Sequence, residues 1–463
     1  MFYCRNEELR KLNKRYNNGK FECVVIYGTR RVGKTALINE FCKDKPTIFF
    51  SALLEGTAKD NLKTFSRAIY AYKEPEAIEA PEYSSFDSAL DEITRLAAKE
   101  RIVFVIDEYP YLAKSYPSIS SRLQHLIDHI WKDNKLYLIL CGSSMSFMEN
   151  QVLGYQSPLY GRRTGQFKIE PLNYKETAVF NPDLDNITNA FVYGITGGIP
   201  HYINKLNVSG DFRNALIENF FDRSAYLFEE PANLLKQELR EPAVYNSVIT
   251  AIAEGASHMN EICTKSGIES GPCSKYLNVL INLGILKKET PMTEKPGKKT
   301  IYSIADPFFR FWYRFVPNNM TPIASGRLER IYDKAIHANL NDYMGLIFEK
   351  MCRDYLLYYA DPDCQLIDIG QWWGTDSVEK KQVQIDLLGT TDKKNEFLIG
   401  SCKFRNEQIG IDELELLKRY ASVFGKGKTY HYFIFSKGGF TEGLKAAADR
   451  GEVKLVTLDD MYS

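Results

Sequence analysis

Two patterns of hydrophobic positions alternate along residues 1–172. Short runs of consecutive apolar residues are typical of buried strands, and apolar residues at every third or fourth position are typical of amphipathic helices. We predict helices at 58–73, 86–99 and 119–131, and strands at 24–27, 46–51, 101–106, 136–141 and 169–172. Because strands and helices alternate, this part is predicted to be α/β with a parallel sheet.

The hydrophobic pattern changes beyond residue 173. Helical periodicity continues to residue 240, with a break at 196–200, where two glycines and a proline indicate a turn. Three short amphipathic segments and two short strands follow, which is the element order of a winged helix. The predicted regions are a core at 1–172, a helical lid at 173–240, a winged helix at 241–305, a connector at 306–340 and an α/β domain at 341–463.

A glycine-bounded loop joins the first strand to a helix. Its sequence, GTRRVGKT at 28–35, has the G-x4-G-K-T spacing of a P-loop. The glycines let successive N–H groups point at phosphate oxygens, and the helix N-terminus adds partial positive charge. We expect Lys34 to contact the β- and γ-phosphates and the Thr35 hydroxyl to bind Mg²⁺. The predicted nucleotide-binding residues of this loop are Gly28, Thr29, Arg30, Arg31, Val32, Gly33, Lys34 and Thr35.

Two acidic residues, Asp107 and Glu108, directly follow the apolar run at 102–106. Open α/β sheets place ligands at the carboxyl ends of their strands. Asp107 is therefore predicted to hold the Mg²⁺ shell, and Glu108 is predicted to orient and activate the attacking water. The alternative is an ordinary acidic strand end, which the P-loop upstream makes less favoured.

Polar residues also follow two later segments of the core. Ser143 comes after the strand at 136–141, and we expect it to contact the γ-phosphate or the water; the alternative is a helix N-cap by Ser143 or Ser144. Arg162 and Arg163 lie between two glycines, and are predicted to stabilise transition-state charge, in cis or across a subunit boundary. The alternative for the arginines is a solvated basic turn.

The N-terminal residues allow two interpretations. Leu9 and Leu12 lie on one helical face, which predicts a short helix that packs on the sheet. The functional alternative places Phe2 or Tyr3 against the nucleotide base, with Arg5 beside it.

Composition narrows the class of protein only slightly. Lys+Arg and Asp+Glu are equal at 59 each, so net charge argues neither for nor against a nucleic-acid partner. The nine cysteines show no metal-ligand spacing, and the N-terminus shows no signal peptide. No apolar run is long enough for a membrane span. These features predict a cytoplasmic protein with reduced thiols and no membrane partner.

The predicted winged helix carries a local basic cluster. Its third helix would enter the major groove of DNA, and its hairpin, the wing, would contact phosphates. The third helix contributes only Lys275, and winged helices also serve as packing modules, so that alternative stays open. The wing lysines are Lys287, Lys288, Lys295, Lys298 and Lys299.

The first 240 residues resemble the archaeal-type P-loop ATPases, which are related to the AAA+ and signal-transduction (STAND) ATPases. The resemblance implies ATP binding and hydrolysis with Mg²⁺, and arginines near the γ-phosphate. It rests on Phe2, Arg5, Glu8 and Leu9, on GTRRVGKT, and on VFVIDE at 103–108, LILCGSS at 138–144, YGRRTG at 160–165 and TGGIP at 196–200.

The last domain is similar to PD-(D/E)xK nucleases. The resemblance assigns the metal-site residues of that family to Glu349, Asp386 and Lys403. Ser401 stands where another carboxylate is expected. Because Mg²⁺ prefers charged oxygens, and Lys403 polarises water only beside a metal, we expect cleavage to be weak or absent. The alternative role is binding of DNA or a protein without cutting.

The sequence as a whole predicts an ATPase that acts as a nucleotide-dependent switch, coupled to double-stranded DNA through the winged helix. Two alternatives remain: an ATP-dependent metal nuclease, and a STAND-like signalling switch with a protein partner. An oligomer is compatible with arginines that act across a subunit boundary.

Overall fold

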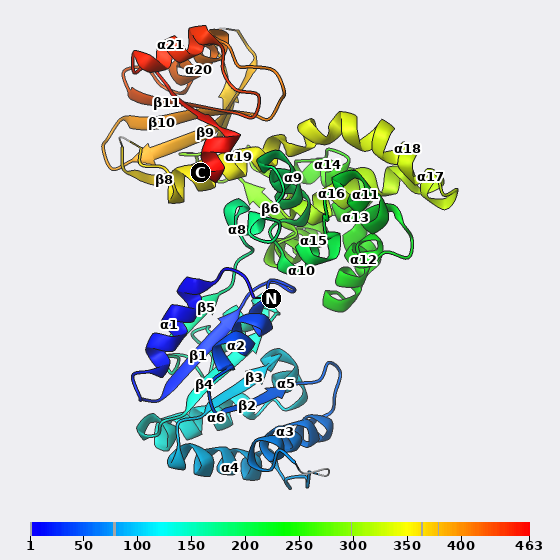
Figure 1. The fold of residues 1–463 in the computed structure, drawn as a ribbon, viewed down its shortest axis with the longest axis vertical. Helices are drawn as coiled ribbons and strands as arrows, with labels where there is room; N and C mark the ends of the chain where they lie inside the picture. The colour runs from blue at the N-terminus through cyan, green and yellow to red at the C-terminus, as the bar shows by residue number, and fades with distance from the viewer. Residues whose placement is uncertain (1, 77–79, 298, 363, 378) are drawn as a thin grey trace. The chain divides into compact units, whose positions relative to one another are not determined.

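The computed structural model describes residues 2–76, 80–297, 299–362, 364–377 and 379–463. The chain forms two compact units (Figure 1). The first contains Met1–Pro171 and Ile199–His201, and the second contains Leu172–Gly198 and Tyr202–Ser463. Lys298, one of the lysines expected in the wing, lies outside the described residues.

The first unit is built on a five-stranded sheet in which all strands are parallel. The strand order is β2-β3-β4-β1-β5, which confirms the predicted α/β fold with a parallel sheet. β4 therefore lies between β1, which precedes the glycine loop, and β3, which ends in the acidic pair. The strands are β1 (Glu22–Tyr27), β2 (Thr47–Ser51), β3 (Val103–Asp107), β4 (Tyr137–Gly142) and β5 (Gly165–Lys168).

The edge strand differs from the prediction. β5 covers residues 165–168 rather than 169–172, and it pairs with β1 only as far as Tyr27. β1 ends there because Gly28 begins the loop, so the residues after Ile169 have no strand to pair with. Pro171 also lacks the amide N–H that a strand ladder requires.

Helices cover both faces of this sheet. Cys23, Val25 and Tyr27 belong to one hydrophobic cluster, whereas Val24 and Ile26 belong to another. Successive side chains of a strand point to opposite faces, so the two clusters are the two layers of the core. The helices are α1 (Asn6–Tyr16), α2 (Lys34–Cys42), α3 (Ala58–Lys73), α4 (Phe86–Lys99), α5 (Tyr109–Ser115), α6 (Ile119–His129) and α7 (Met145–Phe147).

Beyond Pro171 the chain is first helical, as the periodicity indicates. Gly197 ends α9 with a φ of +64°, and Gly198 has a φ of +70°. These left-handed conformations suit glycine and account for the break between two helices. The helices are α8 (Tyr174–Ala178), α9 (Asn186–Thr196), α10 (Pro200–Leu206), α11 (Phe212–Leu216) and α12 (Tyr226–Glu238).

Three helices and a two-stranded hairpin follow, in the order that the sequence predicts. The hairpin is antiparallel and pairs Leu286 with Ile304 and Glu289 with Ile301. Further helices then lead to the last domain. The elements are α13 (Pro242–Ala253), α14 (Met259–Ser266), α15 (Ser270–Asn282), β6 (Leu286–Glu289), β7 (Ile301–Ile304), α16 (Pro307–Phe315), α17 (Met320–Ala324), α18 (Leu328–Ile331) and α19 (Leu340–Tyr358).

The chain ends in a second five-stranded sheet, of order β12-β11-β10-β9-β8 (Figure 1). β9 is antiparallel to both of its neighbours, β8 and β10, whereas β10, β11 and β12 are parallel. Helix α20 packs on one face of this sheet through Leu414 and Leu417, whereas Phe348 of α19 contacts Phe404 just beyond β10. The elements are β8 (Leu366–Thr375), β9 (Gln382–Thr391), β10 (Glu396–Lys403), α20 (Ile411–Phe424), β11 (Thr429–Ser436), α21 (Glu442–Asp449), β12 (Lys454–Thr457) and α22 (Leu458–Tyr462).

Among the helices of the described residues, none combines the length and the apolar character that crossing a membrane would require.

Candidate functional site

The carboxyl ends of three neighbouring strands meet at one edge of the first sheet. Tyr27 at the end of β1 pairs with Gly142 at the end of β4, and Ile106 near the end of β3 pairs with Leu140. The residues that follow these strands, which include the glycine loop, the acidic pair and Ser143, therefore lie together. This is the edge at which open parallel sheets bind ligands.

The glycine loop approaches neighbouring backbone closely. A Cβ on Gly28 would come within 2.3 Å of the carbonyl oxygen of Ile169, so only glycine fits there. Gly33 has a φ of +97° and precedes α2, whose N-terminus has no side-chain cap. The first amide groups of α2 are therefore available to a ligand, as the phosphate-binding prediction requires. Val32 is fully buried and anchors the loop.

The lysine of the loop is held inside it. Lys34 is 7% exposed, and its Nζ donates to the carbonyl oxygens of Gly28 and Thr29, at 2.9 and 2.8 Å. Burial lowers the pKa of Lys34. The Thr29 hydroxyl is buried and has no hydrogen-bond partner among the described residues. An ammonium group and an unsatisfied hydroxyl in a loop of open amides fit a polyanionic ligand such as a triphosphate.

Thr35 and Asp107 are joined directly. The Thr35 hydroxyl donates to Oδ2 of Asp107 at 3.2 Å, and Oδ1 of Asp107 accepts from the backbone N–H of Glu108 at 3.0 Å. A hydroxyl and a carboxylate are hard oxygen ligands, which fit Mg²⁺. Among the described residues, no three His, Cys, Asp or Glu side chains converge on a metal position. This pair therefore fits an ion that takes its other ligands from phosphate and water.

Glu108 and Ser143 form the second polar pair at this edge. The Ser143 hydroxyl donates to both carboxylate oxygens of Glu108, at 3.1 and 3.0 Å. Glu108 has a φ of +52°, which is uncommon for a residue with a side chain and costs free energy. Ser144 is the N-cap residue of α7, as the helix-cap alternative expects, but its side chain makes no capping hydrogen bond.

The N-terminal residues reach the same edge. Arg5 donates to the carbonyl oxygen of Glu170, which closely follows the last residue paired with β1, and forms an ion pair with Glu8 at 3.4 Å. Phe2 packs against the hydrophobic cluster that contains Leu12. The predicted docking helix is present as α1, and contact of Phe2 and Arg5 with a base stays a prediction.

The two arginines do not lie at this edge. Thr164, which follows them, exchanges hydrogen bonds with the backbone of Cys23, at the start of β1. Gly28 lies five positions beyond Cys23, which corresponds to roughly 16 Å along a strand. Arg162 is bound by both oxygens of Asp128, each at 2.8 Å. A role of Arg162 and Arg163 in cis is therefore not supported by this geometry, and a role across a subunit boundary stays a prediction.

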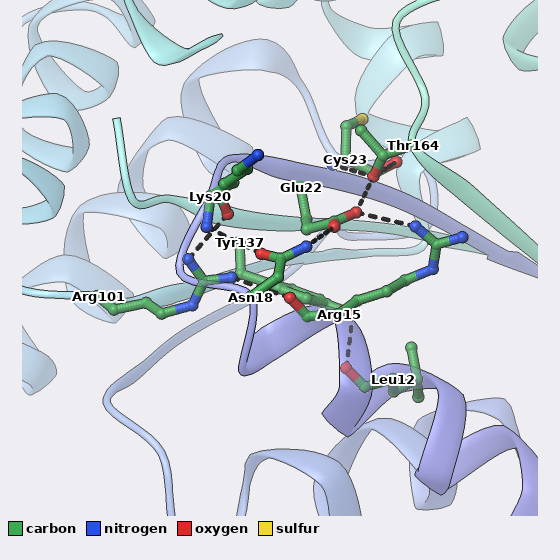
Figure 2. A network of polar contacts seen from close by, with 9 residues as sticks. All are labelled: Leu12, Arg15, Asn18, Lys20, Glu22, Cys23, Arg101, Tyr137 and Thr164. Carbon is green, nitrogen blue, oxygen red and sulfur yellow. Dashed lines mark hydrogen bonds and ion pairs between the residues drawn. The ribbon is translucent and has the colours of Figure 1, made fainter. Parts of the chain in front are cut away.

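A polar network that the sequence pattern did not indicate holds the arginine segment (Figure 2). Glu22 is 4% exposed and accepts hydrogen bonds from Arg15 at 3.2 Å, from Asn18 at 2.6 Å and from Thr164. Arg101 donates to the carbonyl oxygens of Arg15 and Lys20. The network joins the end of α1, the start of β1 and the loop before β5. The only sign of this network in the sequence is Glu22, an isolated acidic residue at the start of the apolar run of β1.

The terminal domain brings its three predicted residues together. Lys403 on β10 lies 3.6 Å from Asp386 on β9, and Oδ2 of Asp386 accepts from the N–H of Cys402 at 3.0 Å. Glu349 on α19 accepts from Gln371. Burial, and then the charge of Asp386, raise the pKa of Glu349 to about 8.

A fourth member of this group, Glu413 on α20, was not predicted from the sequence. Its Oε1 accepts from the Ser401 hydroxyl at 2.7 Å and lies 3.3 Å from Nζ of Lys403. A carboxylate is thus present beside the position where the sequence lacks one. The only signal was an acid in the first turn of the next helix, which is common at helix N-termini.

Comparison with known proteins places these features in a family. An ATPase domain found predominantly in Archaea matches residues 2–206, and a family of archaeal and bacterial proteins of unknown function matches residues 312–414. An uncharacterized protein of Methanocaldococcus jannaschii is 32% identical over 468 residues, which cover 99% of this chain and 100% of that protein.

Two further similarities are a short local match and a likeness of fold. An uncharacterized ATP-binding protein of the same organism is 47% identical over 45 residues, 10% of this chain and 76% of its own length. The Walker-type ATPase of Pyrococcus abyssi superposes with a TM-score of 0.53 at 21% identity, over 68% of this chain and 96% of its own. At that identity the likeness shows the fold alone.

Proposed function

The chain belongs to the family of archaeal P-loop ATPases, and from this premise we propose that it binds ATP with Mg²⁺ at the carboxyl edge of the first sheet and hydrolyses it. One observation supports the proposal above all. The glycine loop, the Thr35–Asp107 pair and the Ser143–Glu108 pair occupy one edge and are linked by direct hydrogen bonds. Their chemistry matches the parts that phosphoryl transfer to water needs.

The phosphate-binding role falls to the loop from Gly28 to Thr35. Its amides and the N-terminus of α2 bind phosphate oxygens. The Lys34 ammonium, which donates to two backbone carbonyl oxygens in the absence of a ligand, donates to the phosphate oxygens instead. Thr35 and Asp107 hold Mg²⁺, which neutralises charge on the phosphates when it is bound. Phe2 and Arg5 are proposed to contact the base.

Glu108 is proposed to orient and deprotonate the attacking water, with Ser143 fixing its carboxylate. The water oxygen bonds to the γ-phosphorus, and the bond from that phosphorus to the β–γ bridging oxygen breaks. ADP leaves with the bonding electrons, and the proton passes to Glu108. The left-handed backbone of Glu108 holds this base at the edge without a change in conformation.

We propose DNA as the partner that the nucleotide state controls. A cavity of about 690 Å³ lies between the N-terminal residues of α14 and the hairpin, lined in part by His258, Asn260, Lys288 and Tyr302. Polar and cationic groups on two elements suit a phosphate backbone. Two wing lysines are already paired, Lys287 with Glu289 and Lys299 with Glu294, both at 2.7 Å. Of the other wing lysines, Lys288 lines this cavity, and we assign the proposed contact to it.

The test is ATP hydrolysis with and without double-stranded DNA, at low and moderate salt. Stimulation that weakens with salt would support coupling of the P-loop to DNA. The Lys34→Ala variant is the control, and it should lose nucleotide binding. Tight ATP binding by that variant would contradict the assigned site. Hydrolysis without any DNA response would favour the signalling alternative, with a protein as the partner.

A second candidate function is metal-dependent cleavage of nucleic acid, and Glu413 is the observation that favours it. The expectation of weak or absent cleavage rested on the missing carboxylate at Ser401. Glu413 is hydrogen-bonded to Ser401 and next to Lys403, so it supplies a charge at that position. The nuclease-like group is then Glu349, Asp386, Lys403 and Glu413.

A further inference from the structure

The hairpin formed by β6 and β7 closes one side of a cavity of about 190 Å³ in the second unit. Lys287 and Glu289 line this cavity from the hairpin, whereas Glu349 and Asp386 line it from α19 and β9. Pockets that hold even a small organic ligand usually exceed about 300 Å³. While the hairpin holds this position, the cavity is therefore too small to admit a nucleic-acid strand.

The loop of the hairpin is fastened to β8 by its backbone. The N–H of Met292 donates to the carbonyl oxygen of Gln371 at 2.8 Å. Gln371 lies between Gly370 and Trp372, where the register of β8 with β9 shifts, and such a bulge leaves a residue outside the regular ladder. β8 is also an edge strand of its sheet. The hairpin loop thus bonds to a strand edge that would otherwise offer its backbone groups to another chain.

The side chain of Met292 adds a close packing contact to this hydrogen bond. It is partly buried and packs against the hydrophobic cluster that contains Trp372. A Cβ on Gly370 would lie 2.9 Å from Cγ of Met292 and 3.0 Å from its Sδ. The absence of a side chain at Gly370 therefore allows Met292 to dock, and a larger residue there would displace it.

The docked loop and the acidic group are connected through Gln371. Its backbone carbonyl holds Met292, and its side-chain amide donates to the carboxylate of Glu349. Burial and the charge of Asp386 raise the pKa of Glu349, and the positive charge of Lys287 on the hairpin opposes that rise. The hairpin thus contributes to the electrostatics of the acidic group as well as to its enclosure.

We propose that the hairpin is an autoinhibitory lid, which docks on β8 through Met292 and shuts nucleic acid out of the nuclease-like group. The inference rests on the second candidate function, metal-dependent cleavage, and adds the regulation of that site. The inhibitory face of the hairpin differs from the face assigned to DNA. Lys287 and Glu289 share one face of β6 and line the closed cavity, whereas Lys288 points to the opposite face and lines the other cavity.

The experiment measures access to the closed cavity in the full chain, without nucleotide. Asp386→Cys places a thiol on its wall, and the probe is fluorescein maleimide, which is larger than the cavity; mass spectrometry locates the label. We expect Met292→Gln and Gly370→Val, each added to Asp386→Cys, to speed labelling of that position about tenfold or more, because a weaker contact raises the population of the open form. Met320→Gln is the matched control, since Met320 is already 40% exposed on α17. Thermal unfolding of each variant excludes loss of fold.

Nicking of plasmid DNA in Mg²⁺, by chains that keep Asp386, is the second readout. We expect Met292→Gln and Gly370→Val to raise the nicking rate about tenfold or more and Met320→Gln to leave it unchanged. Labelling at the same rate in all three backgrounds overturns the lid. Faster labelling with unchanged nicking overturns its inhibitory role. Faster labelling with no nicking by any variant overturns the cleavage function instead and leaves the closing contact standing.

Discussion

The hydroxyl of Ser143 donates to both carboxylate oxygens of Glu108, at 3.1 and 3.0 Å. The two residues follow neighbouring strands, β4 and β3, and the serine is only 7% exposed. A carboxylate held at both oxygens has little freedom to rotate. Ser143 is therefore a positioning residue for the proposed base rather than a group that acts on phosphate itself.

This relationship predicts different effects for two substitutions. Glu108→Gln should lower kcat for ATP hydrolysis by about 10²–10³-fold, because the base is lost. Ser143→Ala should lower kcat by about tenfold and leave KM nearly unchanged, because it removes only the orientation of the base. Steady-state kinetics with ATP-binding measurements would check this. Ser144→Ala is the control, and an equal loss in both serine variants would contradict the assignment.

A role of the arginine pair across a subunit boundary predicts complementation. Arg163→Ala keeps its P-loop, and Lys34→Ala keeps its arginines. Neither variant alone should hydrolyse ATP at more than about a tenth of the wild-type rate, if an arginine in trans contributes as in other phosphoryl-transfer sites. A mixture of the two should recover activity, measured as turnover against mixing ratio. Strictly additive activity would show that the arginines do not act in trans.

The wing predicts a specific lysine effect. Lys288→Gln should weaken duplex binding about threefold to tenfold and lower the slope of log affinity against log salt by about one, because one phosphate contact is lost. Lys299→Gln is the matched control, since Lys299 already pairs with Glu294 at 2.7 Å. Fluorescence anisotropy over a salt series measures both. Equal losses in the two variants would argue for general electrostatic attraction without a defined contact.

The buried carboxyl of Glu349 predicts a pH dependence of stability. Burial and the charge of Asp386 raise its pKa from 4.5 to about 8, so the folded chain binds this proton more tightly than the unfolded chain does. The resulting stability is fully present below pH 4.5 and is lost as pH rises through 8. Glu349→Gln should therefore stabilise the protein at pH 8.5 by about 5 kcal/mol at most and change it little at pH 4. Urea unfolding followed by tryptophan fluorescence would report this, since Trp372 lies in the core of the same sheet. A stabilisation that is equal at both pH values would contradict the assigned pKa.

The position of Glu413 beside Ser401 leads to a prediction about metal-dependent cleavage of nucleic acid. Metal-dependent nicking of plasmid DNA should fall at least about tenfold in Glu413→Gln, as it should in Asp386→Ala, because each removes a charge that supports the metal and Lys403. Glu415→Gln, on the same helix and exposed, is the control. Full nicking by Glu413→Gln would show that the acid serves only as the structural partner of Lys403.

The sequence by itself determined the parts whose signals are local. Apolar runs directly precede both the loop from Gly28 to Thr35 and the acidic pair Asp107 and Glu108. Consecutive residues therefore predict the strand, the loop and the ligand-binding groups together. The parallel sheet followed from the alternation of strands and helices. The β6–β7 hairpin and the helices before it were likewise predicted from hydrophobic periodicity and turn residues.

Only the tertiary structure decided what depends on strand order and on contacts between distant segments. The order β2-β3-β4-β1-β5 places Ser143 beside Glu108, but it leaves Arg162 at the opposite edge with Asp128. Glu413 reaches Ser401 because α20 packs on β10, and no spacing along the chain encodes that packing. Local periodicity fixes which face of an element is apolar, whereas the meeting of two faces is settled by the packing of the whole core.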